Sequence, residues 1–157
     1  GDESGNISNP DIGQVGWYSS LVLDALGHPI VSYQDFSNSH LKVLQCDDLM
    51  CAGDESNNIS SFGADGAYLS MRLDSLGCPI MSSYDAENEA LKLRFFKSSK
   101  CKSDLDRVVT PVKVKTQNTV GLYTSLALDN KGYPVVSYYD ASNGDLKILR
   151  CVTRGCE

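Results

Sequence analysis

The last third of the chain reads Gly121-Leu-Tyr-Thr-Ser-Leu-Ala-Leu-Asp-Asn-Lys-Gly-Tyr-Pro-Val-Val-Ser-Tyr-Tyr-Asp-Ala-Ser-Asn-Gly-Asp-Leu-Lys-Ile-Leu-Arg-Cys151, and two earlier stretches are copies of it. The positions that all three copies share are Gly27, Gly77 and Gly132; Pro29, Pro79 and Pro134; Asp35, Asp85 and Asp140; Asn38, Asn88 and Asn143; and the pairs Leu41-Lys42, Leu91-Lys92 and Leu146-Lys147. The spacing from Gly27 to Gly77 is 50 residues and that from Gly77 to Gly132 is 55 residues. A repeat of this length is typical of solenoids, propellers and threefold-symmetric β folds, so it predicts architecture more strongly than chemistry.

The composition is that of a globular protein with a hydrophobic core. Apolar residues make up 41% of the 157 residues and charged residues 22%. The 14 Lys and Arg are outnumbered by 20 Asp and Glu, which gives a formal charge of −6. Nucleic acids and anionic membranes both require a basic patch, so we expect neither as a partner. The apolar runs are too short to span a membrane, and the chain begins without a signal-peptide pattern, as expected of a mature form.

Matched cysteines close the first and third copies. Cys46 and Cys51 lie five residues apart, as do the last two cysteines, whereas Phe96 replaces the first cysteine of the middle copy. This leaves two unmatched cysteines, which we expect to pair with each other. The predicted disulfides are Cys46–Cys51, Cys151–Cys156 and Cys78–Cys101. Such pairing predicts a secreted or otherwise extracytoplasmic protein. The alternative, a zinc site, would need closer cysteine spacing or more histidines than His28 and His40.

Each copy reads as short strands separated by turns. The strands expected in the first copy are Tyr18–Leu23, Ile30–Tyr33, Leu41–Leu44 and a weaker fourth strand at Asn58–Phe62, with a counterpart at Val108–Lys115 after the second copy. The shared glycine follows the first strand, where a tight hairpin needs a positive φ. Because helical periodicity is absent, we predict an all-β fold.

The repeat is cyclic. Gly1-Asp-Glu-Ser4 matches Gly53-Asp-Glu-Ser56, which belongs to the fourth-strand segment of the first copy. The chain therefore opens with a fourth strand and ends after a third one, which favours a closed ring over a solenoid. We predict one domain, 1–157, made of a closing fourth strand (1–16), repeat 1 (17–66), repeat 2 (67–121) and repeat 3 (122–157).

The pattern Ser-Tyr-x-Asp-x-x-Asn-x-x-Leu-Lys, preceded by Leu-Asp-x-x-Gly-x-Pro, resembles a repeat of multi-copy secreted bacterial proteins. In those proteins the copies are similar to blades of a β-propeller of the broad sialidase-like type. The resemblance covers essentially the whole chain and implies four-stranded blades. It implies no common activity, because this chain lacks the Ser-x-Asp-x-Gly-x-Thr-Trp box of true sialidase repeats.

Three blades are too few to close a propeller, which has four to eight. We therefore expect a homodimer with six blades, in which the N-terminal strand of each chain completes the last blade of its partner. The alternative is a β-trefoil or β-prism, in which three copies close within one monomer.

The candidate binding residues lie where the second strand turns into the third and where the first strand begins. They are Trp17, Tyr18, Tyr68 and Tyr123; Asp35, Asp85 and Asp140; and Asn38, Asn88 and Asn143. Carboxylates and amides could bind sugar hydroxyls, and aromatic rings offer an apolar platform. In the alternative interpretation the Asp and Asn side chains hydrogen-bond their own turns and the tyrosines pack between blades.

We expect no catalytic residue, no metal and no cofactor, because no nucleophile, histidine or arginine cluster recurs in a known pattern. The predicted function is a non-catalytic binding module, with carbohydrate as the expected ligand class. One alternative is a glycosidase that uses Asp35, Asp85 and Asp140 as paired carboxylates. The other is a purely structural repeat domain.

Overall fold

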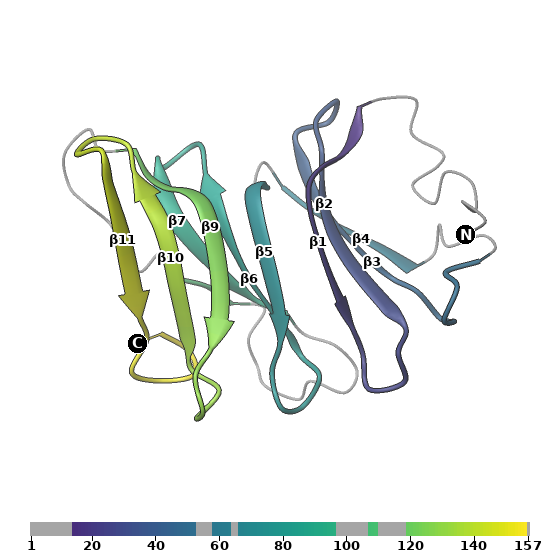
Figure 1. Cartoon of the computed structure of the whole chain (residues 1–157). Coiled ribbons are helices and arrows are strands. Elements are labelled where there is room, and N and C mark those ends of the chain that lie inside the picture. The colour runs from purple at the N-terminus through teal and green to yellow at the C-terminus, as the bar shows by residue number, and fades with distance from the viewer. Residues whose placement is uncertain (1–13, 53–57, 64–65, 97–106, 110–118, 157) are drawn as a thin grey trace.

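The computed structural model describes residues 14–52, 58–63, 66–96, 107–109 and 119–156 (Figure 1). These residues form three antiparallel sheets and no helix. The first sheet contains β1 (Val15–Leu23), β2 (Pro29–Asp35), β3 (His40–Gln45) and β4 (Ile59–Phe62). The second contains β5 (Ala67–Leu73), β6 (Pro79–Asp85), β7 (Ala90–Phe95) and β8 (Arg107–Val109), and the third contains β9 (Val120–Leu128), β10 (Pro134–Asp140) and β11 (Asp145–Arg150).

Each sheet is a meander in which every strand pairs with the next one along the chain. The pairing has the same register in the three copies, with Asp35 opposite His40, Asp85 opposite Ala90 and Asp140 opposite Asp145. The prediction of an all-β fold built from three repeats of short antiparallel strands is therefore confirmed. Among the described residues the third sheet has three strands, and β11 is its outer strand.

β1, β2 and β3 are longer than predicted, whereas β4 begins one residue later than predicted, at Ile59. β1 begins at Val15 instead of Tyr18, because Val15 still pairs with Asp35 across an irregular stretch of the ladder. For the same reason β1 crosses the boundary drawn at residue 16. β8 begins near the predicted start at Val108, whereas residues 110–118 lie outside the described residues. Residues 1–13 also lie outside them, so the predicted exchange of an N-terminal strand stays a prediction.

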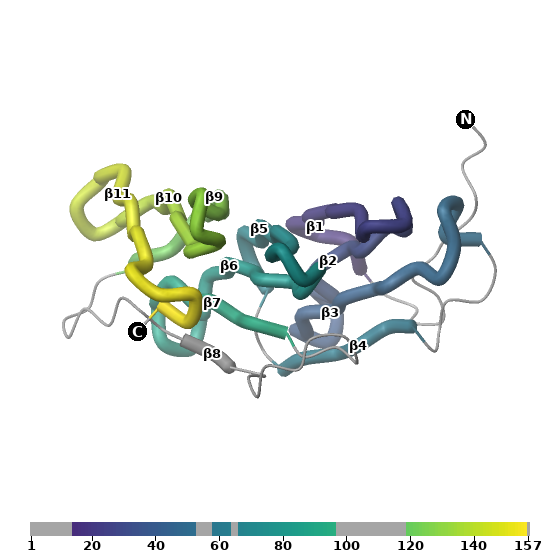
Figure 2. The backbone as a smooth tube through the Cα atoms, turned by 90° about the horizontal axis from the view of Figure 1, so that it is seen from below, coloured from purple at the N-terminus to yellow at the C-terminus, as the bar shows by residue number. Residues whose placement is uncertain are grey.

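The three sheets are arranged like a fan. The second sheet lies between the first and the third, and the first strands of the sheets, β1, β5 and β9, lie side by side (Figures 1 and 2). From this line the later strands of each sheet extend outward (Figure 2). Hydrophobic clusters fill the two spaces between neighbouring sheets.

The fan has two rims that differ in content. One rim, here called the turn rim, holds the β2–β3, β6–β7 and β10–β11 turns together with the beginnings of β1, β5 and β9 (Figure 1). The opposite rim, here called the hairpin rim, holds the β1–β2, β5–β6 and β9–β10 turns, which contain Gly27, Gly77 and Gly132. These glycines have φ values of 87°, 77° and 76°, which confirms the positive φ expected from the sequence. The repeated Asp and Asn residues of the turn rim are thus separated from the repeated glycines of the hairpin rim by the length of the strands.

The predicted disulfides Cys46–Cys51 and Cys151–Cys156 are present. Cys78 is also disulfide-bonded, and its predicted partner Cys101 lies outside the described residues. Disulfides of this kind are typical of proteins in an oxidising, extracytoplasmic setting. In the described part of the chain, no helix has the length and apolar character that a bilayer crossing requires.

Candidate functional site

The three predicted tyrosines have an unusual backbone. Tyr18, Tyr68 and Tyr123 have φ values of 51°, 57° and 52°, in the left-handed region that costs energy for any residue with a Cβ atom. Each follows, two residues later, a glycine that also has positive φ, at 91°, 133° and 100° for Gly16, Gly66 and Gly121. Register shifts mark a bulge at this point in all three first strands. Bulges re-aim side chains, so the strained backbone sets where the tyrosine rings point.

The re-aimed rings meet across the sheets. The ring centroids of Tyr18 and Tyr68 lie 4.6 Å apart, and those of Tyr68 and Tyr123 lie 4.4 Å apart. Burial and hydrogen bonds with the side chains of Tyr18 and Tyr123 raise the pKa of the Tyr68 hydroxyl, so this group is neutral at physiological pH. The hydroxyl of Thr124 donates a hydrogen bond of 2.7 Å to the carbonyl of Tyr68, which fixes the bulged backbone against the neighbouring sheet.

Further aromatic side chains extend this line in both directions. Trp17 stacks on Phe36 with ring centroids 5.1 Å apart, and Tyr139 lies 6.4 Å from Tyr123. We call the resulting set the aromatic row; its members are Phe36, Trp17, Tyr18, Tyr68, Tyr123 and Tyr139. The exposed fractions of Trp17, Phe36 and Tyr123 are 46%, 53% and 66%. Tyr18 and Tyr139 are exposed as well, whereas Tyr68 in the middle of the row is half-buried. Exposed aromatic side chains that gather in one place mark interaction sites more often than single exposed ones do.

A pocket of about 410 Å³ lies beside the aromatic row, between the first and second repeats. Its lining includes polar groups of Gln34, Ser39 and Glu87 and the ring of Tyr84. Tyr84 connects the pocket to the row, because its ring lies 6.4 Å from that of Tyr68. A concave site with an aromatic wall and a few polar groups has the size and chemistry of a small-ligand site.

The repeated aspartates hold their own turns together. The carboxylate of Asp35 is fully buried and accepts hydrogen bonds from the side chain of Asn38 at 2.8 Å and from its backbone N–H at 3.1 Å. Lys42 forms an ion pair with the same carboxylate at 2.9 Å. Burial alone would raise the pKa of Asp35, but the bonds from Asn38 and Lys42 outweigh burial and hold the pKa below its usual value.

The second copy repeats this arrangement and the third varies it. Asp85 binds the side chain of Asn88 at 2.9 Å and Lys92 at 3.0 Å. The Asp140 carboxylate accepts the same bond from Asn143 at 2.8 Å, but the ammonium of the equivalent lysine binds Asp145 instead. The pKa of Asp140 is lowered mainly by the Asn143 side chain. In all three copies the predicted Asp and Asn thus lie at the turn rim, with the carboxylates directed at their own turns.

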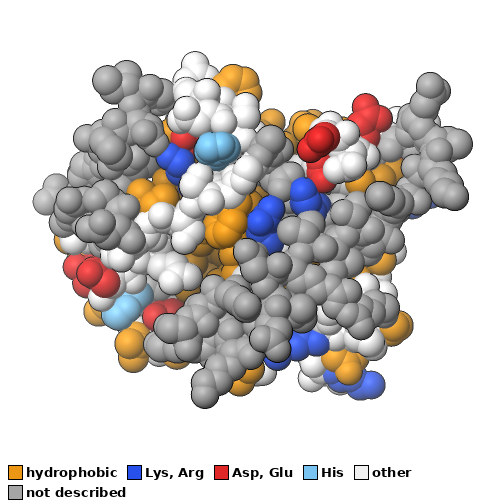
Figure 3. Space-filling model, turned by 180° about the vertical axis from the view of Figure 1, so that it is seen from behind, with side chains coloured by type: hydrophobic (Ala, Val, Ile, Leu, Met, Phe, Trp, Pro, Cys, Tyr) orange, Lys and Arg blue, Asp and Glu red, His pale blue; other side chains and the backbone are white. Residues whose placement is uncertain are grey.

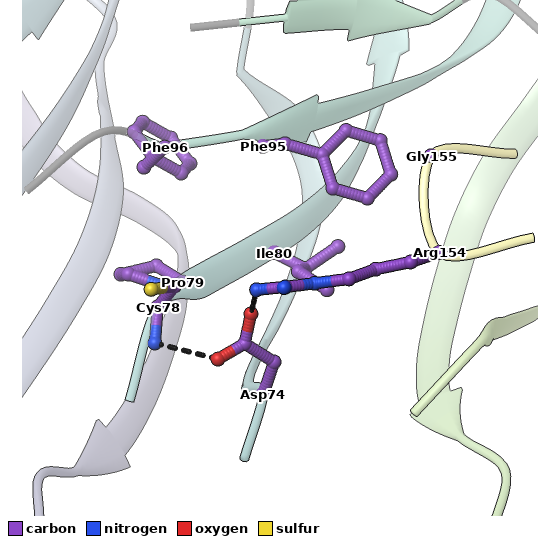
Figure 4. A pocket seen from close by; sticks show the side chains of 8 residues that line it. All are labelled: Asp74, Cys78, Pro79, Ile80, Phe95, Phe96, Arg154 and Gly155. Carbon is purple, nitrogen blue, oxygen red and sulfur yellow. Dashed lines mark hydrogen bonds and ion pairs between the residues drawn. The ribbon is translucent and has the colours of Figure 1, made fainter. Parts of the chain in front are cut away.

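A second, smaller pocket of about 90 Å³ lies at the hairpin rim between the second and third repeats (Figure 4). An ion pair between Asp74 and Arg154 crosses it, and the other carboxylate oxygen of Asp74 accepts a hydrogen bond from the backbone N–H of Cys78 (Figure 4). The same oxygen also accepts a hydrogen bond from the backbone N–H of Leu76. With its carboxylate oxygens bound in this way, Asp74 joins two repeats structurally. Among the described residues no group of three or more His, Cys, Asp or Glu could hold a metal ion.

Sequence reasoning did not identify several of these residues. Phe36, Tyr84 and Tyr139 lie in or directly after the second strands, and their rings contact aromatic rings of the first strands. Phe36 contacts Trp17, Tyr84 contacts Tyr68, and Tyr139 contacts Tyr123. Their signal in the sequence is position, since Tyr84 and Tyr139 directly precede the repeated aspartate and Phe36 directly follows it. The recurring lysine was visible as part of the Leu-Lys pair, but its bond to the aspartate was not predicted.

On the face seen in Figure 3, Lys and Arg of the described residues lie in small separate groups among acidic and hydrophobic side chains. Neither the protein-family models nor the curated proteins contain a match to this sequence.

Proposed function

We propose that the chain is a secreted, non-catalytic binding module whose three sheets are blades of a β-propeller. Three features support the propeller: the meander order of the strands, the fan of sheets with their first strands side by side (Figure 2), and the sequence repeat. The fan also argues against a trefoil or prism, because the second sheet separates the first from the third. The disulfides support the secreted location.

The proposed ligand is a neutral glycan bound along the aromatic row. The observation that carries this proposal is the left-handed tyrosine, repeated three times, which holds aromatic faces at the surface at a cost in backbone energy. Tyrosine and tryptophan combine an apolar face with a polar group, which matches the alternating apolar faces and hydroxyls of a sugar chain. The formal charge of −6 disfavours an anionic glycan.

The exposure and the pKa values of the three aspartates do not favour the glycosidase alternative. A general acid needs a raised pKa and a nucleophile needs free access to the substrate. Asp35, Asp85 and Asp140 are at most 5% exposed, and their pKa values are lowered rather than raised. The purely structural alternative leaves the exposed aromatic row without a role.

The test is binding of a panel of neutral oligosaccharides, including glucan, mannan, xylan and chitin fragments, followed by calorimetric titration of the best ligand. We expect Trp17→Ala to weaken binding about fivefold or more, because an aromatic platform contributes on the order of 1 to 3 kcal/mol. Leu26→Ala is the matched control, since Leu26 is 67% exposed on the hairpin rim and should leave binding unchanged.

Three results would contradict the proposal. Binding that survives both Trp17→Ala and Tyr123→Ala would place the glycan elsewhere. Release of reducing sugar that Asp140→Asn abolishes would support the glycosidase. No binding to any panel member would leave the structural alternative.

A further inference from the structure

The same type of junction joins the first sheet to the second and the second sheet to the third. In the first occurrence Met71 of β5 is 0% exposed and lies in one cluster with Leu41 and Val43 of β3. The corresponding residues of the second occurrence are Leu126 of β9 and Leu91 and Leu93 of β7. Each junction therefore places one side chain of a first strand, which we call the head, on two side chains of a preceding third strand, which we call the tail.

The same hydrogen bond accompanies both junctions. The backbone N–H of Met71 donates to the hydroxyl of Ser20 at 3.0 Å, and the backbone N–H of Leu126 donates to the hydroxyl of Ser70 at 3.0 Å. A serine of the preceding first strand thus sets the register between sheets. The groups that would make this bond a third time are the hydroxyl of Ser125 and the backbone N–H of Leu21.

Each end of the fan exposes one half of this junction. At the tail of the third repeat, Leu146 and Ile148 are 74% and 68% exposed, although their equivalents in the other repeats are at most 3% exposed. At the head of the first repeat, Leu21 is 59% exposed, although its equivalents are at most 1% exposed. Leu23, two residues further along β1, is 56% exposed. An uncovered apolar face at both ends is unfavourable for a chain in water.

We infer that a second copy of this chain covers both faces, with the head of each copy on the tail of the other. The two internal junctions identify the occupant, because the surface that fits the tail at Leu146 and Ile148 is a head such as that at Leu21. A twofold pairing uses this contact twice and leaves no face open. The inference rests on the sheet faces and is independent of any glycan.

Two copies supply six sheets, which lies within the range of four to eight for closed propellers. Closure would also continue the aromatic row. Tyr68 lies between two tyrosines of neighbouring first strands, Tyr18 and Tyr123. Tyr123 contacts such a tyrosine on one side only, and it is 66% exposed. Head-to-tail pairing places the Tyr18 of one copy next to the Tyr123 of the other, so a ring of six tyrosines would form.

The test is the solution mass from light scattering coupled to size exclusion, on the intact chain and on two complementary variants. We expect the unmodified chain to have twice the chain mass of 17.1 kDa. Leu21→Lys spoils only the head and Leu146→Asp spoils only the tail, so each variant alone should be monomeric, with the dissociation constant raised more than about 100-fold. Mixing the two variants should restore a two-chain species, because one junction then stays intact and the introduced lysine faces the introduced aspartate in the other.

Leu26→Asp is the matched control, because Leu26 is equally exposed but lies outside both faces, and it should remain a dimer. Far-UV circular dichroism checks that every variant is folded, which is expected because the replaced side chains are exposed in the single chain. A monomeric unmodified chain would overturn the inference. So would a dimer that only one of the two variants disrupts, since that pattern indicates head-to-head or tail-to-tail pairing, and so would variants that do not recover on mixing.

Discussion

The glycines that precede the bulged tyrosines allow a quantitative test of the sheet junctions. Gly16, Gly66 and Gly121 are equivalent in sequence and all have positive φ, so replacement by alanine strains the backbone similarly at each. Their surroundings differ. A Cβ atom at Gly121 would lie 2.5 Å from the Cα of Leu91, one at Gly66 would lie 3.3 Å from the Cα of Leu41, and one at Gly16 would meet nothing within 4 Å.

The expected loss of folding stability therefore differs among the three substitutions. Backbone strain contributes on the order of 1 to 3 kcal/mol to each substitution. At Gly121 the overlap with the backbone of Leu91 requires the second and third sheets to separate by about 1 Å to reach an ordinary carbon contact. Such overpacking adds about 1 to 3 kcal/mol. We expect Gly121→Ala to destabilise the fold by about 2 to 6 kcal/mol, Gly16→Ala by about 1 to 3 kcal/mol, and Gly66→Ala by an intermediate amount.

The assay is urea unfolding followed by circular dichroism, in a Leu146→Asp background that keeps a second copy away from Gly16. With a slope of about 2 kcal/mol per molar urea, the difference between Gly121→Ala and Gly16→Ala corresponds to about 0.5 to 1.5 M in the midpoint. Equal midpoints for the two variants would refute the close packing of Gly121 on Leu91. A lower midpoint for Gly16→Ala would reverse the reasoning altogether.

Three further predictions concern the turns, the disulfides and the aromatic row. Asp85→Asn should destabilise the fold by about 2 to 4 kcal/mol in thermal unfolding because it removes the buried carboxylate that binds Lys92 and the Asn88 side chain, whereas Asp145→Asn at an exposed position should cost less than about 0.5 kcal/mol. Because the pKa of Asp85 is lowered in the folded chain, its contribution to stability should be complete above the ordinary pKa of about 4 and should disappear as the pH falls through the lower folded value, which unfolding at stepped pH would detect. Reducing either five-residue disulfide loop should lower the unfolding free energy by about 2 kcal/mol, and an unchanged melting temperature would contradict this. In alkaline ultraviolet titration, Tyr68→Phe should remove a tyrosine that ionises late, and loss of an early transition instead would contradict the position of Tyr68 between two others.

The strands could be predicted from the sequence because the repeat marks them three times. A glycine, a proline and an aspartate punctuate each copy, and the apolar residues between them alternate with the period of a strand. The strand ends were missed by one to three residues at β1 to β3, because pairing continues through Pro29 and Asp35, which turn chemistry alone would place outside the ladder. The relative placement of the sheets depends on contacts between residues about 30 to 55 positions apart, such as Leu41 with Met71 and Ser70 with Leu126, and local patterns do not encode these contacts.

Part of the candidate site could also be predicted from the sequence. The tyrosines recur, and so does the glycine two residues before each of them, which is a signal for a bulge. What the sequence does not give is the direction of the rings after the bulge, and so it could not join Phe36 and Tyr139 to the row. For the aspartates the two interpretations differ in whether the carboxylate faces a ligand or its own turn, and the sequence pattern alone is compatible with both. The contribution of the lysine was not predicted, because it depends on the register that pairs Asp35 with His40 and brings Lys42 within 2.9 Å of the carboxylate.

Comparison among the copies indicates where along the row a ligand should make its specific contacts. The strained tyrosine is the same in all three copies, so it provides a common platform and not a distinction between them. The positions beside it vary: Trp17 corresponds to Ala67 and Leu122, and Phe36 corresponds to Ala86 and Ala141. Since Trp17 and Phe36 stack on each other and are exposed, the first repeat holds the largest aromatic surface. If the row binds a glycan, Trp17→Ala should therefore weaken binding more than Tyr123→Ala does, and equal losses would indicate that the tyrosines alone form the site.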